Sequence, residues 1–576
     1  MMMAHLLTLI LFTPLAGAGL LLCVPRAQEQ AIRWTAAIVA TLGFLLSLPL
    51  WFRYDFTATG WQFAERAEWI PSIGAWYYLG VDGYSALLIL LTTLIGAIAV
   101  LCSWAGITER VKEYYVSLLI LQTGLLGAFM AVDFLLFFLF WEVMLVPMYF
   151  LIGIWGGGRR LYSAIKFFLY TLVGSVVMLL GILALYFHGH SVTGAYTFDV
   201  TELQQLTIPF ALQKWIFLAL FFGFAIKVPM FPFHTWLPDA HTDAPTAGSV
   251  ILAAIMLKMG TYGFVRFSLP ILPDASRYFV PLVAALAIVG IVYGALVALA
   301  QTDWKRLVAY SSVSHMGMVM LGIFALTPVG LTGGLLQQIN HGISTGALFL
   351  IVGIVYERRH TREIAEYGGL SKAMPVFAAV FLIMTLSSIG LPALNGFIGE
   401  LLILQGVYIV HPIWAGVGAV GIVLGAAYML WLFQRTMFGT LDRPENASMA
   451  DLGAREIVTF APLIALAVWI GIYPAPFIRR LEGTVTRVTA RVNPAAQPAV
   501  AGVPAAAGPA LNDTGAGTGF NPTLVTCDSA PAAGPKPSAT PSAPPDFVTI
   551  ASCADSPSKP APKPAPKAPP KKPGGR

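Results

Sequence analysis

Long apolar stretches recur along most of this sequence, and they constrain the fold more than any other feature. We count about fourteen, each near the roughly 17–25 residues that a helix needs to cross a ~30 Å hydrocarbon core. The chain is 57% hydrophobic and only 11% charged, whereas a soluble domain has about 25% charged residues. A membrane β-barrel needs short strands of alternating polarity, and the sequence lacks them. We therefore predict an all-α polytopic membrane protein with spans at residues 4–23, 34–52, 83–103, 114–132, 134–153, 163–187, 213–231, 245–267, 280–300, 307–325, 331–355, 374–405, 411–437 and 457–476.

The loops between these spans differ in their content of Lys and Arg. One alternating set, which includes Arg110, Lys112, Arg359 and Arg435, holds about sixteen basic residues, and the other holds about five before the C-terminal tail. Because cytoplasmic loops carry the excess of Lys and Arg, we expect a multi-pass protein of a bacterial inner membrane with both termini on the periplasmic side. The formal charge of +6 follows from this topology and from the tail, so it does not indicate a nucleic-acid partner.

Two of the expected spans are interrupted by residues that break helices. Pro229 and Pro232 follow Lys227 in the seventh span, and Pro392 lies shortly before Glu400 in the twelfth. A proline removes a backbone donor and disrupts a helix. Because the two spans are five apart, they cross the membrane in opposite directions, as expected for an inverted repeat with broken helices at its site.

This pattern predicts five segments. Residues 1–112 hold spans one to three and an outward hairpin loop at 53–84, and residues 113–268 form a first repeat of spans four to eight. Residues 269–440 form the inverted repeat of spans nine to thirteen, 441–482 hold span fourteen, and 483–576 form an Ala/Pro-rich outward tail. Cys527 and Cys553 lie in that tail on the oxidising side, where they either pair or remain free.

Six ionisable residues lie deep in the expected spans. They are Glu142, Lys227, Lys258, Glu400, His315 and His341. A charge at the centre of a bilayer costs about 2.5–3.5 kcal/mol on insertion scales. The backbone at a helix break must also be buried in protein or lie against water. The break beside Lys227 therefore indicates a hydrated cavity that reaches the lysine.

Structural roles would explain each of these residues singly. Glu142 and Lys227 could form a static ion pair, Lys258 could extend to an interface, Glu400 could cap an unwound turn, and each histidine could be a satisfied core residue. Their combination in one bundle with two helix breaks instead favours proton transfer. Burial disfavours a charged lysine and a nearby carboxylate favours it, so Lys227 can load and release a proton as its pairing with Glu142 changes. Histidines titrate near neutral pH and suit intermediate steps.

Two long stretches resemble a known family. "IKVPMFPFHTWLPDAHTDAPTAGSVILAAIMLKMGTYG" and "QTDWKRLVAYSSVSHMG" are similar to signature stretches of the antiporter-like membrane subunits of respiratory complex I, and the resemblance covers roughly residues 1–480. It implies a core of fourteen helices with inverted repeats, which acts as one of several proton-pumping units. The family contains three kinds of antiporter-like chain. Two of them usually have lysine at the position of Glu400, so the acid here implies the third kind.

The resemblance also implies roles and partners. Glu142 and Lys227 would be the paired acid and base, Lys258 the central relay and Glu400 the outward exit group. His315 and His341 would line a hydrated axis between Lys258 and Glu400. NADH, FMN, iron–sulfur clusters and quinone would bind other subunits, so we expect no cofactor or metal on this chain. Its partners would be other membrane-arm subunits, including two further antiporter-like chains, and the lipid bilayer.

We therefore expect a proton-translocating subunit that is driven by quinone reduction elsewhere in a complex. Two alternatives remain open at this point. One is a subunit of a multisubunit sodium/proton antiporter, which shares the fold and the Glu/Lys pair. The other is a membrane scaffold that does not pump and whose charges only hold neighbouring subunits.

Overall fold

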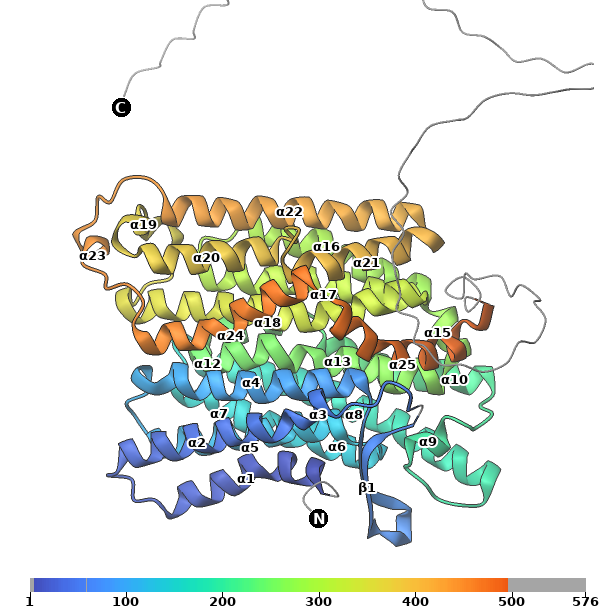
Figure 1. Ribbon diagram of the computed structural model, residues 1–576. Helices are drawn as coiled ribbons and strands as arrows, with labels where there is room; N and C mark the ends of the chain where they lie inside the picture. The colour runs from blue at the N-terminus through green and yellow to red at the C-terminus, as the bar shows by residue number, and fades with distance from the viewer. Residues whose placement is uncertain (1–4, 59, 496–576) are drawn as a thin grey trace, which may run out of the picture. The chain divides into compact units, whose positions relative to one another are not determined.

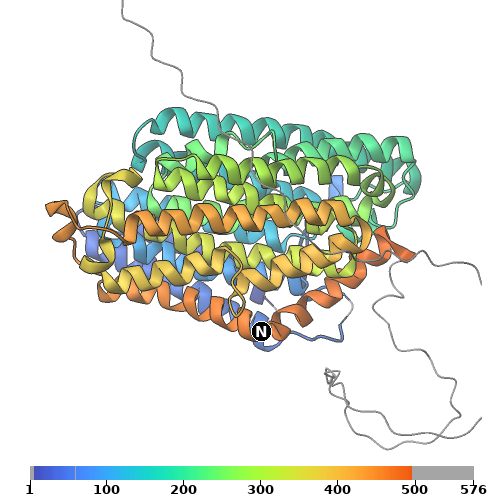
Figure 2. The ribbon, with the colours of Figure 1, turned by 90° about the horizontal axis from the view of Figure 1, so that it is seen from above.

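The computed structural model describes residues 5–58 and 60–495. Within this part, helices run side by side along one common direction (Figures 1 and 2). The tail from residue 496, with Cys527 and Cys553, lies outside the described residues.

Among the described residues, thirteen helical segments are long and apolar enough to cross a membrane. Two shorter apolar helices, α20 (Pro375–Ser388) and α21 (Asn395–Val410), together occupy the expected twelfth span. Counted with this broken span, the described residues confirm the predicted fourteen. The other spans are α1 (Leu6–Cys23), α2–α3 (Glu29–Ser47 and Pro49–Phe52), α4 (Gly83–Gly106), α5 (Val111–Met130), α6–α7 (Phe134–Val143 and Leu145–Trp155), α8 (Arg160–Thr193), α10 (Phe210–Lys227), α12–α14 (Thr246–Ile271), α16 (Val280–Leu299), α17 (Trp304–Phe324), α18 (Pro328–Arg359), α22 (Pro412–Met437) and α24 (Ala454–Ile472).

Shorter segments connect these spans or interrupt them. The eighth span consists of five segments. They are α12 (Thr246–Ile251), a π-helix at Leu252–Met256, α13 (Leu257–Gly263), a second π-helix at Phe264–Ser268 and α14 (Leu269–Ile271). The connecting helices are α9 (Val200–Leu203), α11 (Trp236–Asp243), α15 (Pro273–Tyr278), α19 (Leu370–Ala373) and α23 (Pro444–Ala447), with short 3₁₀ turns at Pro71–Ile73 and Ile364–Glu366.

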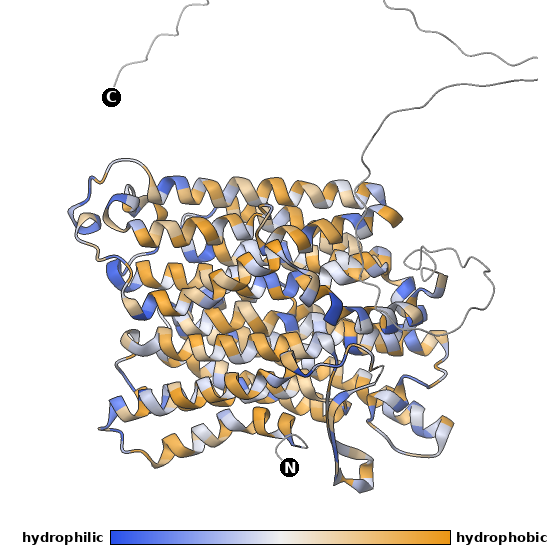
Figure 3. Ribbon diagram, in the orientation of Figure 1, coloured by the Kyte–Doolittle hydropathy of each residue, from blue (hydrophilic) through white to orange (hydrophobic). Residues whose placement is uncertain are grey.

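Burial identifies the centre of the bundle. The most apolar part of α12–α14 is 100% buried and that of α18 is 94% buried, whereas that of α24 is 33% buried. Large apolar side chains such as Trp34, Ile38 and Leu180 are exposed on the outer helices, as expected for a surface that faces lipid. In Figure 3 the helices are mostly orange along their length, and blue gathers toward their ends and in the connections.

The two predicted helix breaks are present. Helix α10 ends at Lys227, and residues 228–235 are not helical before α11 begins at Trp236. The indole nitrogen of Trp236 donates a hydrogen bond to the Ile226 carbonyl (2.9 Å), so protein replaces part of the missing helical pairing. Residues 389–394, which include Pro392, separate α20 from α21.

One end of the bundle carries the predicted hairpin, and we call it the hairpin end. Strands β1 (Gln62–Ile70) and β2 (Ala75–Val81) pair antiparallel there. Asp82 follows β2 and caps α4, and its carboxylate lies 2.8 Å from Arg266 and 2.7 Å from Arg487. These contacts attach α25 (Ala475–Val492), which is not among the candidate spans, to the bundle. Because α25 continues to Val492, helical structure extends beyond the predicted boundary at residue 482.

Candidate functional site

Glu142 and Lys227 lie near each other, at the ends of two helical segments. Glu142 is the second-last residue of α6. The helix is interrupted there, and Pro147 in α7 has no N–H to donate to the carbonyl four residues earlier. Lys227 is the last residue of α10, and its side chain is buried. Its Nζ has no hydrogen-bond partner among the described residues. It lies 5.2 Å from the ring centroid of Trp141, so an aromatic face partly compensates the ammonium.

No ion pair within 4.0 Å joins Glu142 to Lys227 in the described part of the chain, although the two charges interact electrostatically. One carboxylate oxygen of Glu142 is buried without a hydrogen-bond partner among these residues. The geometry is therefore that of a separated acid and base rather than a closed static pair. This separation weakens the purely structural interpretation of the two residues.

Lys258 lies at the centre of the bundle in α13, two residues after the π-helix Leu252–Met256. Its Nζ donates a hydrogen bond to the Ala253 carbonyl in that π-helix (2.6 Å). The same Nζ lies 2.6 Å from Nδ1 of His341. Lys258 is fully buried, so it does not extend to an interface. π-Helical turns interrupt regular helices and are frequent at functional sites.

His341 and His315 continue from Lys258 toward α21. His341 belongs to α18 and His315 to α17, and their ring centroids are 5.7 Å apart. His315 and Glu400 line one small cavity, together with Ser314 and Ser388. The structure therefore brings four predicted residues, Lys258, His341, His315 and Glu400, into one succession.

Glu400 is buried in the second turn of α21, as the sixth residue of that helix. Its Oε1 accepts a hydrogen bond from Gln337 (3.2 Å). At Gly390, where φ is +73°, a Cβ atom would lie 2.5 Å from Glu400 Oε2, so this residue must be glycine for the carboxylate to sit there.

Four intervals in the succession lack a direct polar contact between side chains among residues 5–58 and 60–495. They are Glu142 to Lys227, Lys227 to Lys258, His341 to His315, and His315 to Glu400. Only Lys258 and His341 are joined directly, at 2.6 Å. Proton transfer across the four intervals would need water or side-chain movement.

Sequence reasoning missed several polar residues that support this site. Gln337 holds Glu400, and Asn340 donates to Gln337 Oε1 (3.1 Å) and to the Asn395 carbonyl (2.8 Å). The residues 337, 340 and 341 share one helix, and their spacing of three and four places them on one face of α18. That spacing could have identified these polar residues from the sequence.

Two buried basic groups were also missed as candidates. His241 in α11 stacks on Phe349 at 4.3 Å, and both of its ring nitrogens lack a partner among the described residues. Lys305, which belongs to the basic set that we expected to face the cytoplasm, is buried at the start of α17 and donates to the Ala244 carbonyl (2.6 Å).

Comparison with known proteins agrees with this geometry. Residues 131–425 match the family described as NADH:quinone oxidoreductase/Mrp antiporter, TM. Subunit M of NADH-quinone oxidoreductase from Rhodobacter capsulatus is 45% identical over 490 residues, which cover 82% of this chain and 94% of that protein. Chain 4 of NADH-ubiquinone oxidoreductase from Arabidopsis thaliana is 41% identical over 83% of this chain and 96% of that protein.

Solved structures give the same result for the fold. A chain of respiratory complex I from Thermus thermophilus with bound NADH has a TM-score of 0.77 and 33% identity, over 84% of this chain and 100% of that chain. A chain of the Mrp complex from a Dietzia species has a TM-score of 0.73 at 21% identity, over 86% of this chain and 99% of that chain. The second likeness concerns the fold alone.

The chain therefore belongs to the NADH:quinone oxidoreductase/Mrp antiporter family of multi-pass membrane subunits. Within that family it is an antiporter-like subunit of the complex I kind, and it resembles subunit M. This agrees with the interpretation of the acid at Glu400 as the mark of one kind of antiporter-like chain.

Proposed function

We propose that this chain is a proton-translocating membrane-arm subunit of NADH:quinone oxidoreductase. Protons would move through Glu142, Lys227, Lys258, His341, His315 and Glu400, driven by quinone reduction elsewhere in the complex. The observation that carries the proposal is the close succession at the bundle centre, where Lys258 lies 2.6 Å from His341, and His341 lies 5.7 Å from His315 between ring centroids. His315 in turn shares a cavity with Glu400.

In this mechanism Lys227 takes a proton when Glu142 approaches it and releases the proton when the two separate. The released proton passes to Lys258, then through the two histidines to Glu400, which discharges it on the side of the hairpin end. Moving one charge against 100 mV requires about 2.3 kcal/mol, so each step must be coupled to an external driving force. We propose that this force reaches the chain from partner subunits, including two further antiporter-like chains.

The proposal also assigns a location and a division of labour. The chain would lie in a bacterial inner membrane with both termini on the periplasmic side. NADH, FMN, the iron–sulfur clusters and quinone would bind other subunits, and this chain would contribute proton translocation to the enzyme without a redox site of its own.

A direct test replaces Lys227 with alanine in the assembled complex. We expect Lys227→Ala to leave NADH oxidation by the assembled complex measurable but to lower proton uptake into proteoliposomes per NADH oxidised several-fold. Lys372, an exposed lysine in α19, supplies the matched control, and Lys372→Ala should pump as the unmodified complex does. Normal pumping by assembled Lys227→Ala would contradict the proposal and favour the scaffold.

A sodium/proton antiporter subunit is the second candidate, because the family that residues 131–425 match includes Mrp antiporters as well as NADH:quinone oxidoreductase. The two candidates differ in their driving force. If a sodium gradient drove proton flux through the reconstituted chain and its partners without NADH, the antiporter would be the better assignment. We expect no such flux.

A further inference from the structure

An apolar groove opens on the bundle surface outside the candidate relay. Its cavity volume is about 250 Å³, slightly below the roughly 300–1,000 Å³ of sites that enclose a whole small molecule. All of its lining side chains are aliphatic or aromatic, and they come from α2–α3, α4, α18, α24 and α25. Among them are Leu48, Phe52, Leu90, Ile343, Trp469 and Phe477.

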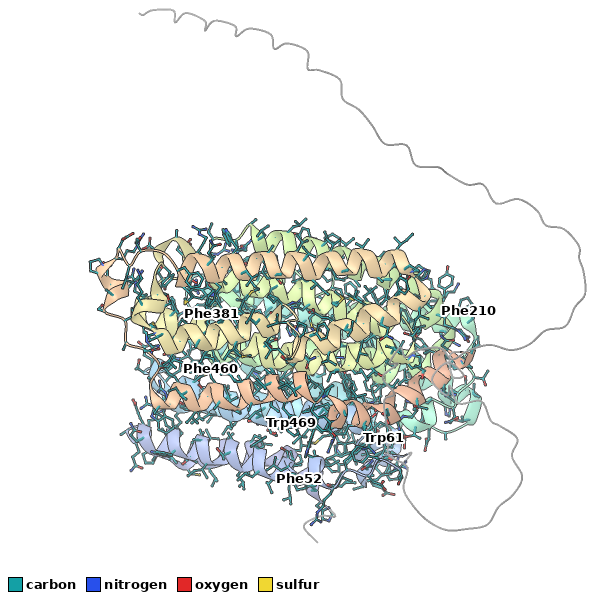
Figure 4. All side chains as sticks on the ribbon, turned by 45° about the horizontal axis from the view of Figure 1, so that its top comes forward. Phe52, Trp61, Phe210, Phe381, Phe460 and Trp469 are labelled. Atoms are coloured by element: carbon teal, nitrogen blue, oxygen red, sulfur yellow. The ribbon has the colours of Figure 1, made fainter. Side chains whose placement is uncertain are left out.

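The groove lies toward the hairpin end of the bundle. Phe52 on α3 and Trp469 on α24 are exposed at its rim, and both are labelled on neighbouring elements in Figure 4. Trp51 also lines it and packs edge-on against Trp469, with ring centroids 5.4 Å apart. Tryptophan is enriched where the hydrocarbon core meets the headgroup region, so this rim is placed at that depth.

A buried cation lies directly against the wall of the groove. The guanidinium carbon of Arg480, one turn beyond Phe477 in α25, is 3.5 Å from the ring centroid of Trp51. Arg480 donates hydrogen bonds to the carbonyls of Trp51 and Pro476 (both 2.6 Å). Its Nε has no partner, and no carboxylate lies within 4.0 Å of it among the described residues. A buried cation without an acid is unfavourable unless an anion is supplied.

Further positive charge surrounds Arg480. The guanidinium carbon of Arg479 lies 5.4 Å from the Phe56 ring and that of Arg480 lies 5.2 Å from the same ring. Arg53 is exposed directly after Phe52. Two acids lie close to these arginines in sequence. Glu482, two residues after Arg480, is exposed, and the carboxylate of Asp55 already accepts hydrogen bonds from the Thr57 amide and hydroxyl (2.8 and 2.7 Å).

We propose that this groove is a binding site for an anionic phospholipid. The acyl chain would fill the apolar groove, where its burial is favoured, and the phosphate would lie beside Arg480, Arg479 and Arg53. Arginine binds phosphate in charge-assisted, often bidentate hydrogen bonds. The juxtaposition of a wholly apolar groove with an acid-free buried arginine at its headgroup end distinguishes this site from the rest of the lipid-facing surface. It does not depend on proton transfer.

The test uses the assembled complex in nanodiscs that contain phosphatidylglycerol with a photoreactive diazirine on its acyl chain. After illumination, peptide mass spectrometry locates the labelled residues. In the unmodified complex we expect labelling of the groove peptides to be several-fold higher than with the matching phosphatidylcholine probe. Arg480→Gln should bring the ratio of the two probes close to one.

Leu90, half-buried on α4 and outside α25, provides an independent variant. Leu90→Trp fills the groove, so labelling of groove peptides by both probes should fall several-fold. Leu180→Trp on the exposed face of α8 is the matched control and should leave groove labelling unchanged. Equal labelling by the two probes in the unmodified complex, or unchanged labelling in Leu90→Trp, would overturn the assignment.

Discussion

Glu142, Lys227, Lys258 and Glu400 each lie within a few residues of an interruption in a helix. The interruptions are the α6–α7 junction at Met144, residues 228–235, the π-helix Leu252–Met256 and residues 389–394. At such places backbone carbonyls and amides lose their regular partners and must be satisfied by protein or by water. A backbone group at such a place can stabilise a buried charge, as the Ala253 carbonyl does for Lys258 (2.6 Å).

Asp133 supplies a prediction for a single residue outside the spans. It caps α6 by accepting from the Leu136 amide (2.9 Å), and its other oxygen accepts from the Trp76 amide (3.0 Å). Burial raises its pKa to about 6, and the nearby Asp199 adds to this shift, whereas the backbone hydrogen bonds oppose it. A raised pKa means that folding favours the protonated form.

The contribution of Asp133 to the stability of the folded protein is therefore complete below the unfolded-state pKa of about 3.9. It is lost as the pH rises through the folded-state pKa of about 6. The change amounts to roughly 3 kcal/mol. Asp133→Asn should remove this pH dependence. The measurement is the temperature at which Cys102, half-buried in α4, becomes reactive toward maleimide between pH 4 and 7. Glu68→Gln on the exposed part of β1 is the control, and a constant difference between Asp133→Asn and the unmodified protein at all pH values would refute the explanation.

The charged residues of the site could be predicted from the sequence, whereas their uncharged partners could not. A Lys or Glu inside an apolar run is rare because it costs free energy in lipid, so Lys227 and Glu400 are conspicuous. Gln337 and Asn340 stand among other small and polar residues of α18, and only the fold shows that they reach Glu400 and Asn395. The separation of Glu142 from Lys227 is likewise a matter of tertiary distance.

At the scale of elements, the approach of α21 to α18 positions Glu400. A Cβ atom at Gly406 in α21 would lie 2.1 Å from the backbone nitrogen of Gly330 in α18. The Thr327 hydroxyl also donates to the Gly406 carbonyl (3.1 Å). The same pair of helices carries the hydrogen bond between Gln337 and Glu400.

We therefore expect Gly406→Ala to push the two helices apart. The cost should be about 1–3 kcal/mol of stability, and proton uptake per NADH should fall because Glu400 loses its position. Gly416→Ala in α22, where nothing lies within 4 Å of the added methyl group, is the matched control and should be neutral or slightly stabilising. Equal thermal stability and pumping of the two variants would contradict this account.

Spans and proline breaks were predictable because length, apolar content and proline act locally. The hairpin at 53–84 was predictable for the same reason, and β1 and β2 confirm it. The π-helix before Lys258 was not, since its hydrogen bonds depend on packing in the bundle centre. Helix α25 was overlooked although Phe477, Leu481, Val485, Val488 and Val492, all buried, recur at helical spacing.

At the scale of the whole molecule, the candidate relay crosses the bundle from α6 to α21. The half from Lys258 to Glu400 is held by close contacts and a shared cavity. Among the described residues, Lys258 and His341 are the only neighbours in the relay that a hydrogen bond joins. Under the proposed mechanism, proton transfer would be controlled at Lys227, whose Nζ is buried without a hydrogen-bond partner among the described residues.

The proposed function requires that the ionisable groups inside this bundle share one water-filled path. An experimental map of the assembled complex that resolves ordered water between Lys227 Nζ and Lys258 would reveal this path. We predict a chain of waters within hydrogen-bonding distance that joins these two lysines in at least one functional state, and a second chain from His315 to Glu400. Tightly packed aliphatic side chains in both intervals, without water in any state, would contradict the claim.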